Sequence, residues 1–419
     1  MIRISLAIAR FLAFNLLLVS LCAAKGPWDL DSYRQAPDYK WVDDSGPIRS
    51  FLFESEPYQG HPTEVFGFYA TPGTLRGDTT TDKNLPAVVL LHGGGGTAFA
   101  EWTMLWAQRG YAAIAVDLCG NRPAAPAVDP DTGKLSGSLR EQPKTRVRLE
   151  RGGPPEGAES KFKNVGGNVT DDWQYHAVAA AMRAHSLVRS FPEVDPDRTA
   201  VTGISWGGYL TCLVASLDDR FKAAVPVYGC GFLYEGESVQ RPQIDSLSAE
   251  QRGQWIREYE PSAWLGQCKV PILFVNGTND KHYPLPSYMR SYRLVQGEKM
   301  LRIEPHMRHG HPPGWAPKEI GLFIDHYLRG GDPLAKIGSV QQTENIASAT
   351  YESNLPIKQA QIHFTSDRGP LVDRTWQNKP ATAKDGKITA EIPADATIWM
   401  LTVTDSRDAM VSSEVDFAD

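Results

Sequence analysis

The sequence is poor in several features that would point to other classes of protein. It has 5 cysteines in 419 residues, and none lies in a CxxC or other zinc-type spacing. Its 43 lysines and arginines stand against 49 aspartates and glutamates, a formal net charge of −6, and no basic stripe suggests a nucleic-acid partner. It has no internal repeat. After residue 24, no stretch is apolar for long enough to cross a membrane.

The first 24 residues differ from the rest of the chain. Arg3 and Arg10 make the start positive, residues 11–21 are largely apolar, and small residues at 22–24 offer a cleavage site. The apolar run is shorter than the roughly 20 residues of a membrane span, and the bulky Leu21 argues against lipid modification of Cys22. We therefore expect a cleaved signal peptide and a secreted or periplasmic protein, with no membrane contact after cleavage.

The four cysteines that would remain are at positions 119, 212, 230 and 268. Export makes disulfides possible, and four cysteines allow three pairings. A chain of this size builds its core without disulfide staples. We expect free, buried thiols.

Short apolar runs alternate with helical periodicity over most of the chain. The continuous runs suit strands buried on both faces of a parallel sheet, and they cover 85–91, 111–118, 199–204, 223–228, 271–276 and 300–303. Two earlier runs, 48–58 and 63–69, predict a hairpin. Helices are predicted over 171–190 with Thr170 as N-cap, over 209–216 and over 317–328. The alternation predicts an α/β fold with a mostly parallel sheet and helices on both faces.

Two regions break this alternation. Residues 121–170 contain 13 glycines and prolines, and they follow a strand, at the sheet edge where open α/β folds bind ligands. From 335 to 419, short strand-like runs follow one another without a helix, which is typical of a small β-sandwich. We predict a domain over 25–334, with residues 121–170 as a long insert over its site, and a C-terminal β-sandwich domain over 335–419.

The segment Gly203-Ile204-Ser205-Trp206-Gly207 has the pattern G-x-S-x-G between a predicted strand and a predicted helix. A serine on such a sharp turn has strained backbone angles, so its flanking positions must be small. Its hydroxyl then projects from the sheet edge, near the positive end of the helix. The pattern in this context indicates that Ser205 is a nucleophile.

A run of glycines, His92-Gly93-Gly94-Gly95-Gly96, directly follows the strand 85–91. Glycines let the backbone approach a tetrahedral oxyanion and aim N–H groups at it. We predict that the N–H of Trp206 and that of Gly94 or Gly95 form an oxyanion hole. His92 is expected to order the loop rather than to act as a base.

The acid and the base are expected after the nucleophile in the chain. Asp280 lies in a turn just after the strand 271–276, whereas Asp218 and Asp219 lie at the far end of the helix that follows Ser205. Three histidines cluster after the last strand, at 306, 309 and 311. Spacing does not decide between them; we choose His309 as the base and keep His311 as the alternative. A metal site is the other interpretation of this cluster, but a serine and an aspartate already explain a histidine here.

Four segments together resemble the α/β-hydrolase superfamily, and more narrowly its dienelactone hydrolase, acetyl xylan esterase and prolyl oligopeptidase branch of exported bacterial hydrolases. They are GISWGGYL, LLHGGGG, NGTND and RHGHPPGW. The resemblance covers about residues 46–330 and implies an eight-stranded, mostly parallel sheet, with Ser205 as nucleophile, His309 as base and Asp280 as its partner. Two departures are the lack of room for a β-propeller between Lys25 and the first strand, and the C-terminal β-region.

We therefore predict a serine esterase that forms an acyl-enzyme and needs no metal or cofactor. Export and the resemblance favour carbohydrate esters, such as acetyl or methyl esters of a polysaccharide or oligosaccharide. The insert has nine basic and six acidic residues, and its Arg122 is a candidate for contact with an acidic sugar chain, although such charge is commonly just solvated. A peptidase or amidase is the alternative, and a non-catalytic carbohydrate-binding protein is a third. The oligomeric state is open.

Overall fold

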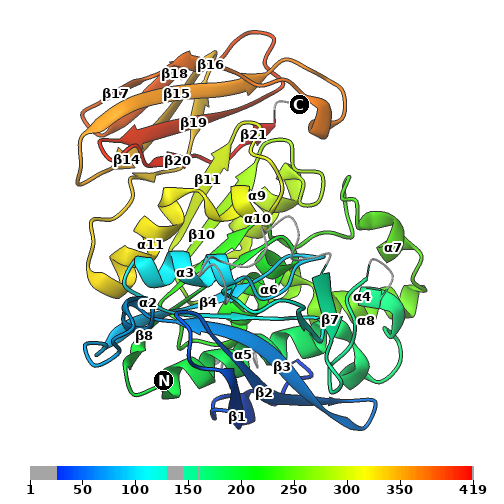
Figure 1. The fold of residues 1–419 in the computed structure, drawn as a ribbon. Helices are drawn as coiled ribbons and strands as arrows, with labels where there is room; N and C mark the ends of the chain where they lie inside the picture. The colour runs from blue at the N-terminus through cyan, green and yellow to red at the C-terminus, as the bar shows by residue number, and fades with distance from the viewer. Residues whose placement is uncertain (1–25, 130–144, 158–159, 418–419) are drawn as a thin grey trace, which may run out of the picture.

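In a computed structural model, residues 26–129, 145–157 and 160–417 are described (Figure 1). The predicted signal peptide lies outside these residues. A long twisted sheet runs through the molecule, and its strands up to residue 304 are β1 (Tyr39–Asp43), β2 (Arg49–Tyr58), β3 (His61–Ala70), β4 (Leu85–Leu91), β5 (Ala112–Val116), β8 (Val194–Ile204), β9 (Ala223–Val227), β10 (Ile272–Gly277) and β11 (Lys299–Glu304). Every predicted run in this part of the chain forms a strand, with small shifts at the ends.

The strand order in this part of the sheet is β1-β2-β3-β5-β4-β8-β9-β10-β11. The strands β5, β4, β8, β9, β10 and β11 are parallel to their neighbours in this set. The hairpin β2–β3 joins them in antiparallel fashion. The strands from β2 to β11 are the eight that the resemblance implies, and β1 adds a short edge strand. The central strands β4 and β5 are buried along almost their whole length, as continuous apolar sequences require.

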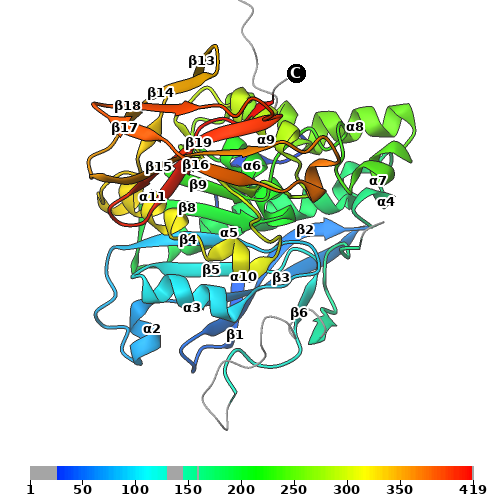
Figure 2. The ribbon, with the colours of Figure 1, turned by 90° about the horizontal axis from the view of Figure 1, so that it is seen from above.

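Helices cover both faces of this sheet (Figure 2). The main ones are α3 (Ala100–Gln108), α5 (Trp173–Ser190), α6 (Trp206–Leu217), α8 (Ala249–Tyr259), α9 (Leu285–Leu294) and α11 (Lys318–Arg329). The short helices are α1 (Leu30–Tyr33), α2 (Pro72–Arg76), α4 (Ser160–Lys163), α7 (Arg241–Asp245) and α10 (His311–Trp315). An ion pair of 2.7 Å between Arg109 and Asp325 ties the end of α3 to α11, and α5 and α6 pack together against β8.

The predicted start of the helix over 171–190 is wrong. Residues Val169–Asp171 form a separate 3-10 turn, η2, and the side chain of Asn168 caps it by accepting the Thr170 N–H. Asp172 has an extended backbone, and α5 begins after it at Trp173. Thr170 is therefore not the N-cap, because a stronger capping residue two positions earlier starts a turn of its own.

The part of the 121–170 insert that is described begins with a small hairpin. Its strands are β6 (Asn121–Pro123) and β7 (Arg146–Arg148). Residues 130–144 of the insert are not among the described residues. After β7 the chain passes residues 152–157 and reaches α4, next to the carboxyl end of the central strands.

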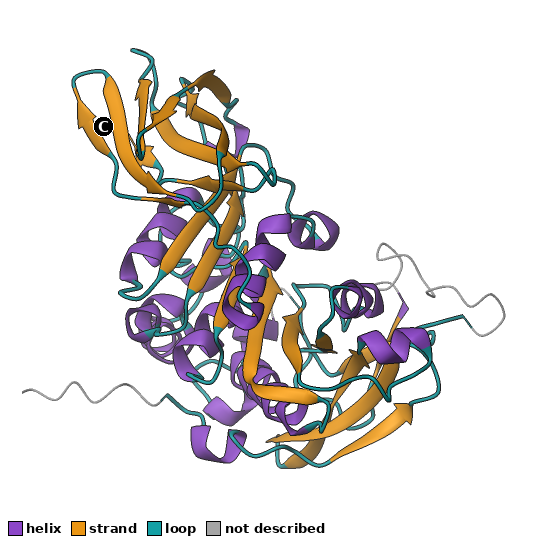
Figure 3. Cartoon of the chain, turned by 90° about the vertical axis from the view of Figure 1, so that its left-hand side faces the viewer, coloured by secondary structure: helices purple, strands orange, loops and turns teal. Residues whose placement is uncertain are grey.

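The C-terminal region forms two groups of strands at one end of the molecule (Figure 3). One group is β12 (Lys336–Ile337), β13 (Gln341–Thr343), β14 (Ile346–Glu352), β17 (Thr382–Lys384) and β18 (Lys387–Glu391). The other is β15 (Ile357–Thr365), β16 (Gln377–Pro380), β19 (Ile398–Asp405), β20 (Met410–Ser412) and β21 (Asp416–Phe417). These extra strands fit the predicted β-domain, and the boundary proposed at 334/335 falls between α11 and β12.

The second group is not separate from the central sheet. Strand β20 pairs with β11 in antiparallel fashion, with Ser412 opposite Leu301, so that the order continues β11-β20-β19-β15-β16. The Ser412 hydroxyl also accepts the Ile303 N–H at 3.0 Å. The C-terminal region thus shares a sheet with the rest of the chain, which sequence patterns within either region could not indicate.

The four cysteines at 119, 212, 230 and 268 are free and buried, which confirms the expectation for them. Burial raises the pKa of the Cys268 thiol to about 11 and keeps it protonated at neutral pH. Of the described helices, none is long and apolar enough to cross a membrane.

Candidate active site

The turn between β8 and α6 holds Ser205 in an unusual backbone conformation. Its φ is +59° and its ψ is −117°, and its N–H is anchored to the carbonyl of Val227 at 2.8 Å. The chain packs so closely here that a Cβ on Gly203 would lie 2.1 Å from the Gly207 carbonyl oxygen, and one on Gly207 would lie 2.0 Å from that of Leu91. The two flanking glycines are therefore required by sterics, as the G-x-S-x-G pattern predicts.

The structure brings Ser205, His309 and Asp280 together. The Nε2 of His309 lies 2.9 Å from the Ser205 Oγ, and its Nδ1 lies 2.6 Å from the Asp280 Oδ2. The three residues come from the ends of three different parallel strands: Ser205 follows β8, Asp280 follows β10 and His309 follows β11. Parallel strands place their carboxyl ends at one edge, so residues distant in sequence meet there.

The carboxylate of Asp280 is fixed in place by the backbone of its own turn. Its Oδ1 accepts the N–H groups of His282 and Tyr283, each at 2.8 Å, and this leaves Oδ2 for His309. The Asp280 side chain is fully buried, whereas that of His309 is 22% exposed. An imidazole oriented in this way by a buried carboxylate can take a proton from the serine and remain stabilised as an imidazolium.

Two aromatic rings pack close to the imidazole of His309. The Tyr228 ring lies 4.6 Å away and the His282 ring 4.3 Å away, centroid to centroid. The Tyr228 hydroxyl donates to the Arg308 carbonyl at 2.6 Å. This bond also anchors the loop 305–310 between β11 and α10, which carries His309 and is called the base loop below. Burial, together with the nearby His309, lowers the pKa of His282 to about 4, so this ring is neutral at neutral pH.

The alternative base, His311, has a different role. Its Nε2 accepts the Gly93 N–H at 2.9 Å, and its ring lies 4.6 Å from that of Phe99. Burial lowers the pKa of His311 to about 3, so it stays neutral and cannot serve as a base at that nitrogen. His311 instead orders the glycine loop, a contact that the two-residue spacing from His309 does not reveal.

The third histidine of the cluster, His306, contacts the C-terminal region. Its Nε2 accepts the N–H of Trp376 in the C-terminal region at 3.4 Å. The three histidines thus have three separate sets of partners, and among the described residues they do not form a metal-ligand group.

A cavity of about 460 Å³ opens beside Ser205. Residues from several loops line it: Gly94, Gly95, Glu156, Gly157, Lys161, Ser205, Trp206, Val239, Gln240, Gln243, His282 and His309. The predicted oxyanion residues Gly94, Gly95 and Trp206 are all in this lining. As the first residue of α6, Trp206 has an N–H outside the hydrogen-bond ladder of the helix. Three lining residues belong to the insert, which therefore does reach the cavity.

The insert contributes a buried ion pair to the wall of this cavity. The Lys161 Nζ lies 2.6 Å from the Glu156 Oε1, and the side chains are 5% and 2% exposed. The ammonium also lies 5.1 Å from the ring centroids of both Trp173 and Trp206. The Glu156 Oε2 accepts the Gly95 N–H at 3.2 Å. A donor of the predicted oxyanion hole is therefore already bound to an anionic oxygen in this structure.

Arg122 is not in the cavity lining. It is exposed on β6, and its guanidinium donates to the Pro123 carbonyl at 3.2 Å. Other arginines of the insert stabilise the loops: Arg146 donates to the Gly96 carbonyl at 2.7 Å and Arg148 to that of Cys119 at 2.6 Å. The charged groups of the described insert that line the cavity are the mutually paired Glu156 and Lys161. A net charge counted along a sequence does not distinguish such pairs from a basic surface.

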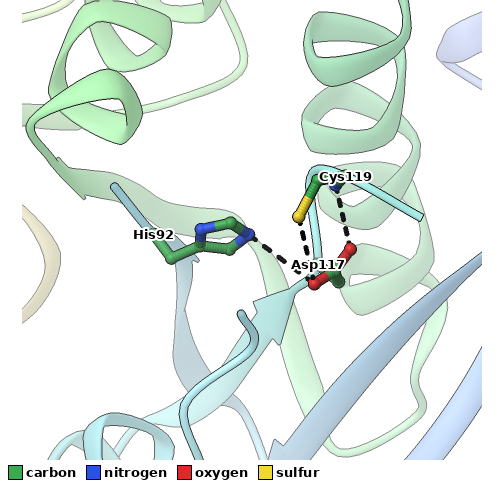
Figure 4. Close-up of side chains that lie close together, drawn as sticks. All are labelled: His92, Asp117 and Cys119. Carbon is green, nitrogen blue, oxygen red and sulfur yellow. Dashed lines mark hydrogen bonds and ion pairs between the residues drawn. The ribbon is translucent and has the colours of Figure 1, made fainter. Parts of the chain in front are cut away.

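Behind the glycine loop, His92, Asp117 and Cys119 lie close enough together to resemble a metal site (Figure 4). Their ligand atoms are already engaged. The His92 Nε2 accepts the Leu118 N–H at 2.9 Å, and the Asp117 Oδ1 accepts the Cys119 N–H at 2.9 Å. The Thr97 hydroxyl donates to the Asp117 Oδ2 at 3.0 Å. The group is an internal hydrogen-bond network, and the His92 Nδ1 donates to the Gly93 carbonyl at 2.8 Å, so that His92 orders the loop as predicted.

Several cavity residues escaped prediction. Glu156 and Lys161 lie five residues apart in a segment without periodicity, and Gln240 is the N-cap of the five-residue helix α7, in which Gln243 lies. Only His282 had a usable sequence signal, because it lies two residues after the predicted acid. The others lie on loops or on the short helices α4 and α7, whose positions depend on tertiary contacts.

The chain is similar to several known proteins. Residues 69–240 match a family model described as acetyl xylan esterase (AXE1). Two solved structures are similar in fold: an acetyl xylan esterase from Paenibacillus sp. R4 (21% identity, TM-score 0.52, 71% of this chain and 92% of that one) and acetyl xylan esterase 1 from Thermoanaerobacterium sp. JW/SL YS485 (17%, 0.49, 73% and 96%).

One curated relative is a protein of Bacillus subtilis (strain 168) called uncharacterized peptidase YuxL. It is 23% identical over 274 residues, a match that covers 59% of this chain and 34% of the relative. The chain therefore spans about a third of the length of this relative.

Proposed function

From its α/β-hydrolase fold, we propose that this chain is a serine hydrolase that cleaves carboxylic esters through Ser205, His309 and Asp280. One observation carries the proposal: a hydroxyl, an imidazole and a buried carboxylate form a continuous hydrogen-bonded relay beside a cavity. The strained turn at Ser205 and the N–H groups of the glycine loop support the same chemistry.

In the proposed mechanism, the Ser205 Oγ attacks the ester carbonyl carbon while the His309 Nε2 accepts the hydroxyl proton. The N–H groups of Trp206 and of Gly94 or Gly95 stabilise the oxyanion that forms. His309 then gives the proton to the leaving alcohol, which produces an acyl-enzyme. A water molecule, deprotonated by His309, attacks the acyl-enzyme and releases the acid and free Ser205.

We propose esters of carbohydrates as the substrate class. The matching family model is described as acetyl xylan esterase, and two side-chain amides, Gln240 and Gln243, line the cavity as groups that can hydrogen-bond sugar hydroxyls. The ion pair between Glu156 and Lys161 has no net charge. It therefore favours a neutral sugar ester, such as an acetyl ester, over the acidic chain that the basic insert suggested.

The proposal is tested by hydrolysis of p-nitrophenyl acetate and of acetylated xylo-oligosaccharides by the purified protein, with Ser205→Ala as control. We expect both substrates to be hydrolysed by the wild type only, and a fluorophosphonate probe to label the wild type only. A wild type that reacts with neither substrate nor probe would contradict the assignment. Equal activity of the wild type and Ser205→Ala would show that Ser205 is not the nucleophile.

A peptidase is the second candidate, and the match to the curated relative called a peptidase supports it. The same relay can cleave an amide if the leaving amine is protonated. A panel of aminoacyl-arylamides measured beside p-nitrophenyl acetate separates the two. A kcat/KM for the best arylamide that exceeds the value for the ester would favour the peptidase.

We also propose that residues 1–24 are a signal peptide that is removed on export to the periplasm or the medium. The positive start, the short apolar run and the small residues at 22–24 support this. Mass spectrometry of the protein recovered from its native host tests it: we expect an N-terminus at Lys25. A protein that retains Met1–Ala24 in the cytosol would contradict it.

A further inference from the structure

The C-terminal region touches the two loops that carry the proposed acid and base. The contact is made by residues 371–376, which comprise the 3-10 turn η5 (Leu371–Asp373) and the stretch that leads into β16. These residues lie about 90 positions after Asp280 in the chain, and they belong to a region outside the predicted hydrolase domain. The contact is built from specific hydrogen bonds rather than from apolar packing alone.

The first bonds come from Asn279, the residue before the proposed acid. Its side-chain Nδ2 points at three carbonyl oxygens of the C-terminal region, those of Arg374 at 2.7 Å, Val372 at 3.1 Å and Leu371 at 3.4 Å. A primary amide has two hydrogens to donate, and three carbonyl oxygens lie within hydrogen-bond distance of this nitrogen. The position of Asn279 is therefore set by the C-terminal backbone.

The remaining bonds close a ring through the base loop. The Asn279 Oδ1 accepts the hydroxyl of Thr278 at 2.6 Å, and that hydroxyl oxygen accepts the His306 N–H at 3.0 Å. The His306 Nε2 then accepts the N–H of Trp376 at 3.4 Å, which returns to the C-terminal segment. His306 has a φ of +58°, a conformation that costs energy for a residue with a side chain and persists where its surroundings impose it.

We infer that the C-terminal segment 371–376 positions the proposed acid and base, and that Asn279 is the positioning residue through which it acts. Asp280 follows Asn279 directly, and His309 follows His306 by three residues, so the ring holds both loops that form the 2.6 Å contact between them. A shift of about 1 Å in such a constellation can cost on the order of a hundredfold in rate. The inference rests on the proposed function, and it gives the C-terminal region a part in the site.

The test uses Asn279→Asp, which keeps the size of the side chain and its Oδ1 acceptor. The substitution replaces the Nδ2, which donates toward the three carbonyls, with a carboxylate oxygen that cannot donate. We expect kcat for p-nitrophenyl acetate to fall roughly ten- to a hundredfold with little change in KM. Asn345→Asp is the matched control, because Asn345 donates to Glu391 at 3.3 Å in the same region, between β13 and β14 and remote from both loops. We expect it to retain wild-type kcat.

Thr278→Val interrupts the ring at a second point with a side chain of the same shape, and covers the case in which Asn279→Asp does not fold. It should lower kcat in the same way while the wild-type thermal unfolding temperature is largely kept. If folded Asn279→Asp and Thr278→Val both keep the wild-type kcat, the inference is wrong.

A readout that needs no turnover separates this inference from the proposed function. The proton on the His309 Nδ1, in its short bond to Asp280, should give a far-downfield proton NMR resonance in the wild type. We expect Asn279→Asp to shift or broaden it and Asn345→Asp to leave it unchanged. A wild type that shows the resonance but hydrolyses no ester would refute the function and leave the positioning claim measurable. A resonance unchanged in Asn279→Asp would refute the positioning claim.

Discussion

Among the described residues there are two relays of the same three chemical groups, one where β8 meets α6 and one beside the carboxyl end of α6. At one end, Ser205, His309 and Asp280 are linked at 2.9 and 2.6 Å. At the other end, the Thr199 hydroxyl lies 2.8 Å from the His185 Nε2, and the His185 Nδ1 lies 2.8 Å from the Asp218 Oδ2. Judged by hydrogen-bond distances alone, the two relays are equivalent.

The two relays differ in burial, in backbone conformation and in their distance from a cavity. The side chains of His185 and Asp218 are fully buried, the His185 ring is stacked 3.6 Å from that of Phe221, and Asp218 is also paired with Arg220 at 2.6 Å. Thr199 lies inside the regular strand β8, whereas Ser205 has a positive φ and borders a cavity that Gly94 and Gly95 help to line. A hydroxyl, an imidazole and a carboxylate in line are therefore not enough to indicate an active site.

The largest expected effect comes from removing the hydroxyl of each relay in turn. Ser205→Ala should lower kcat/KM for p-nitrophenyl acetate by roughly 10⁴-fold or more, because the nucleophile is lost. Thr199→Ala should leave kcat/KM within about twofold and lower the thermal unfolding temperature instead, because the buried His185 Nε2 loses its partner. Steady-state kinetics and thermal unfolding of both variants check this. Similar losses of activity in Ser205→Ala and Thr199→Ala would contradict the assignment of catalysis to the Ser205 relay alone.

The carboxylates provide the next comparison. Asp280→Asn should lower kcat by about 10⁴-fold with the fold intact, because the amide no longer holds the imidazole in the productive tautomer. Asp218→Asn should instead destabilise the protein by roughly 3 kcal/mol, because it leaves Arg220 and the buried His185 without their charged partner. Urea unfolding, combined with activity per folded molecule, measures both. A stable Asp218→Asn that is inactive would contradict this division.

The two relays also differ in their response to pH. Burial lowers the pKa of His185 to about 4, against an ordinary value near 6.5. The unfolded chain therefore binds a proton at His185 that the folded chain does not, so this residue's contribution to stability is complete above about pH 6.5 and is lost as the pH falls toward 4. Asp218, whose pKa is lowered by its bonds to Arg220 and His185, loses its contribution at still lower pH.

We expect the unfolding temperature of the wild type to fall as the pH drops from about 6.5 to 4, and the fall to be shallower in His185→Gln, which cannot be protonated. Thermal unfolding at matched ionic strength across this range measures the slope. An equal slope in the variant would mean that His185 does not carry the effect.

The smallest effect is expected at Glu156, which has no counterpart at the buried relay. Its carboxylate is bonded to the Gly95 N–H, so it competes with a developing oxyanion for that donor. Glu156→Gln keeps the shape and removes the charge, and we expect kcat for p-nitrophenyl acetate to rise by about two- to fivefold. Gln243→Glu, which adds a charge elsewhere in the cavity lining, serves as the comparison. A fall in kcat of Glu156→Gln would assign the carboxylate a favourable role.

The contrast between the relays shows what sequence patterns can predict. The turn at Ser205 can be recognised in the sequence because its sterics require glycines at fixed offsets. The parallel strands can be recognised because they are continuous apolar runs. Asp280 and a histidine of the cluster after β11 follow from their places after two such strands. Nothing in the spacing of 306, 309 and 311 separates the three histidines, whose roles differ only through the partners that folding provides. The N-cap at Thr170 was mispredicted because it depends on a competing neighbour, and Arg122 is not among the residues that line the cavity.

The sequence by itself determined the α/β fold and the sharp turn that carries the proposed nucleophile, because periodicity and local sterics act over a few residues. The tertiary structure alone decided that His309 faces Ser205, that Glu156 and Lys161 pair in the cavity wall, and that β20 joins the central sheet. The first and the last of these contacts connect residues more than a hundred positions apart, and the ion pair lies in a segment without periodicity. The energies of all three depend on burial and distance, which no local pattern records.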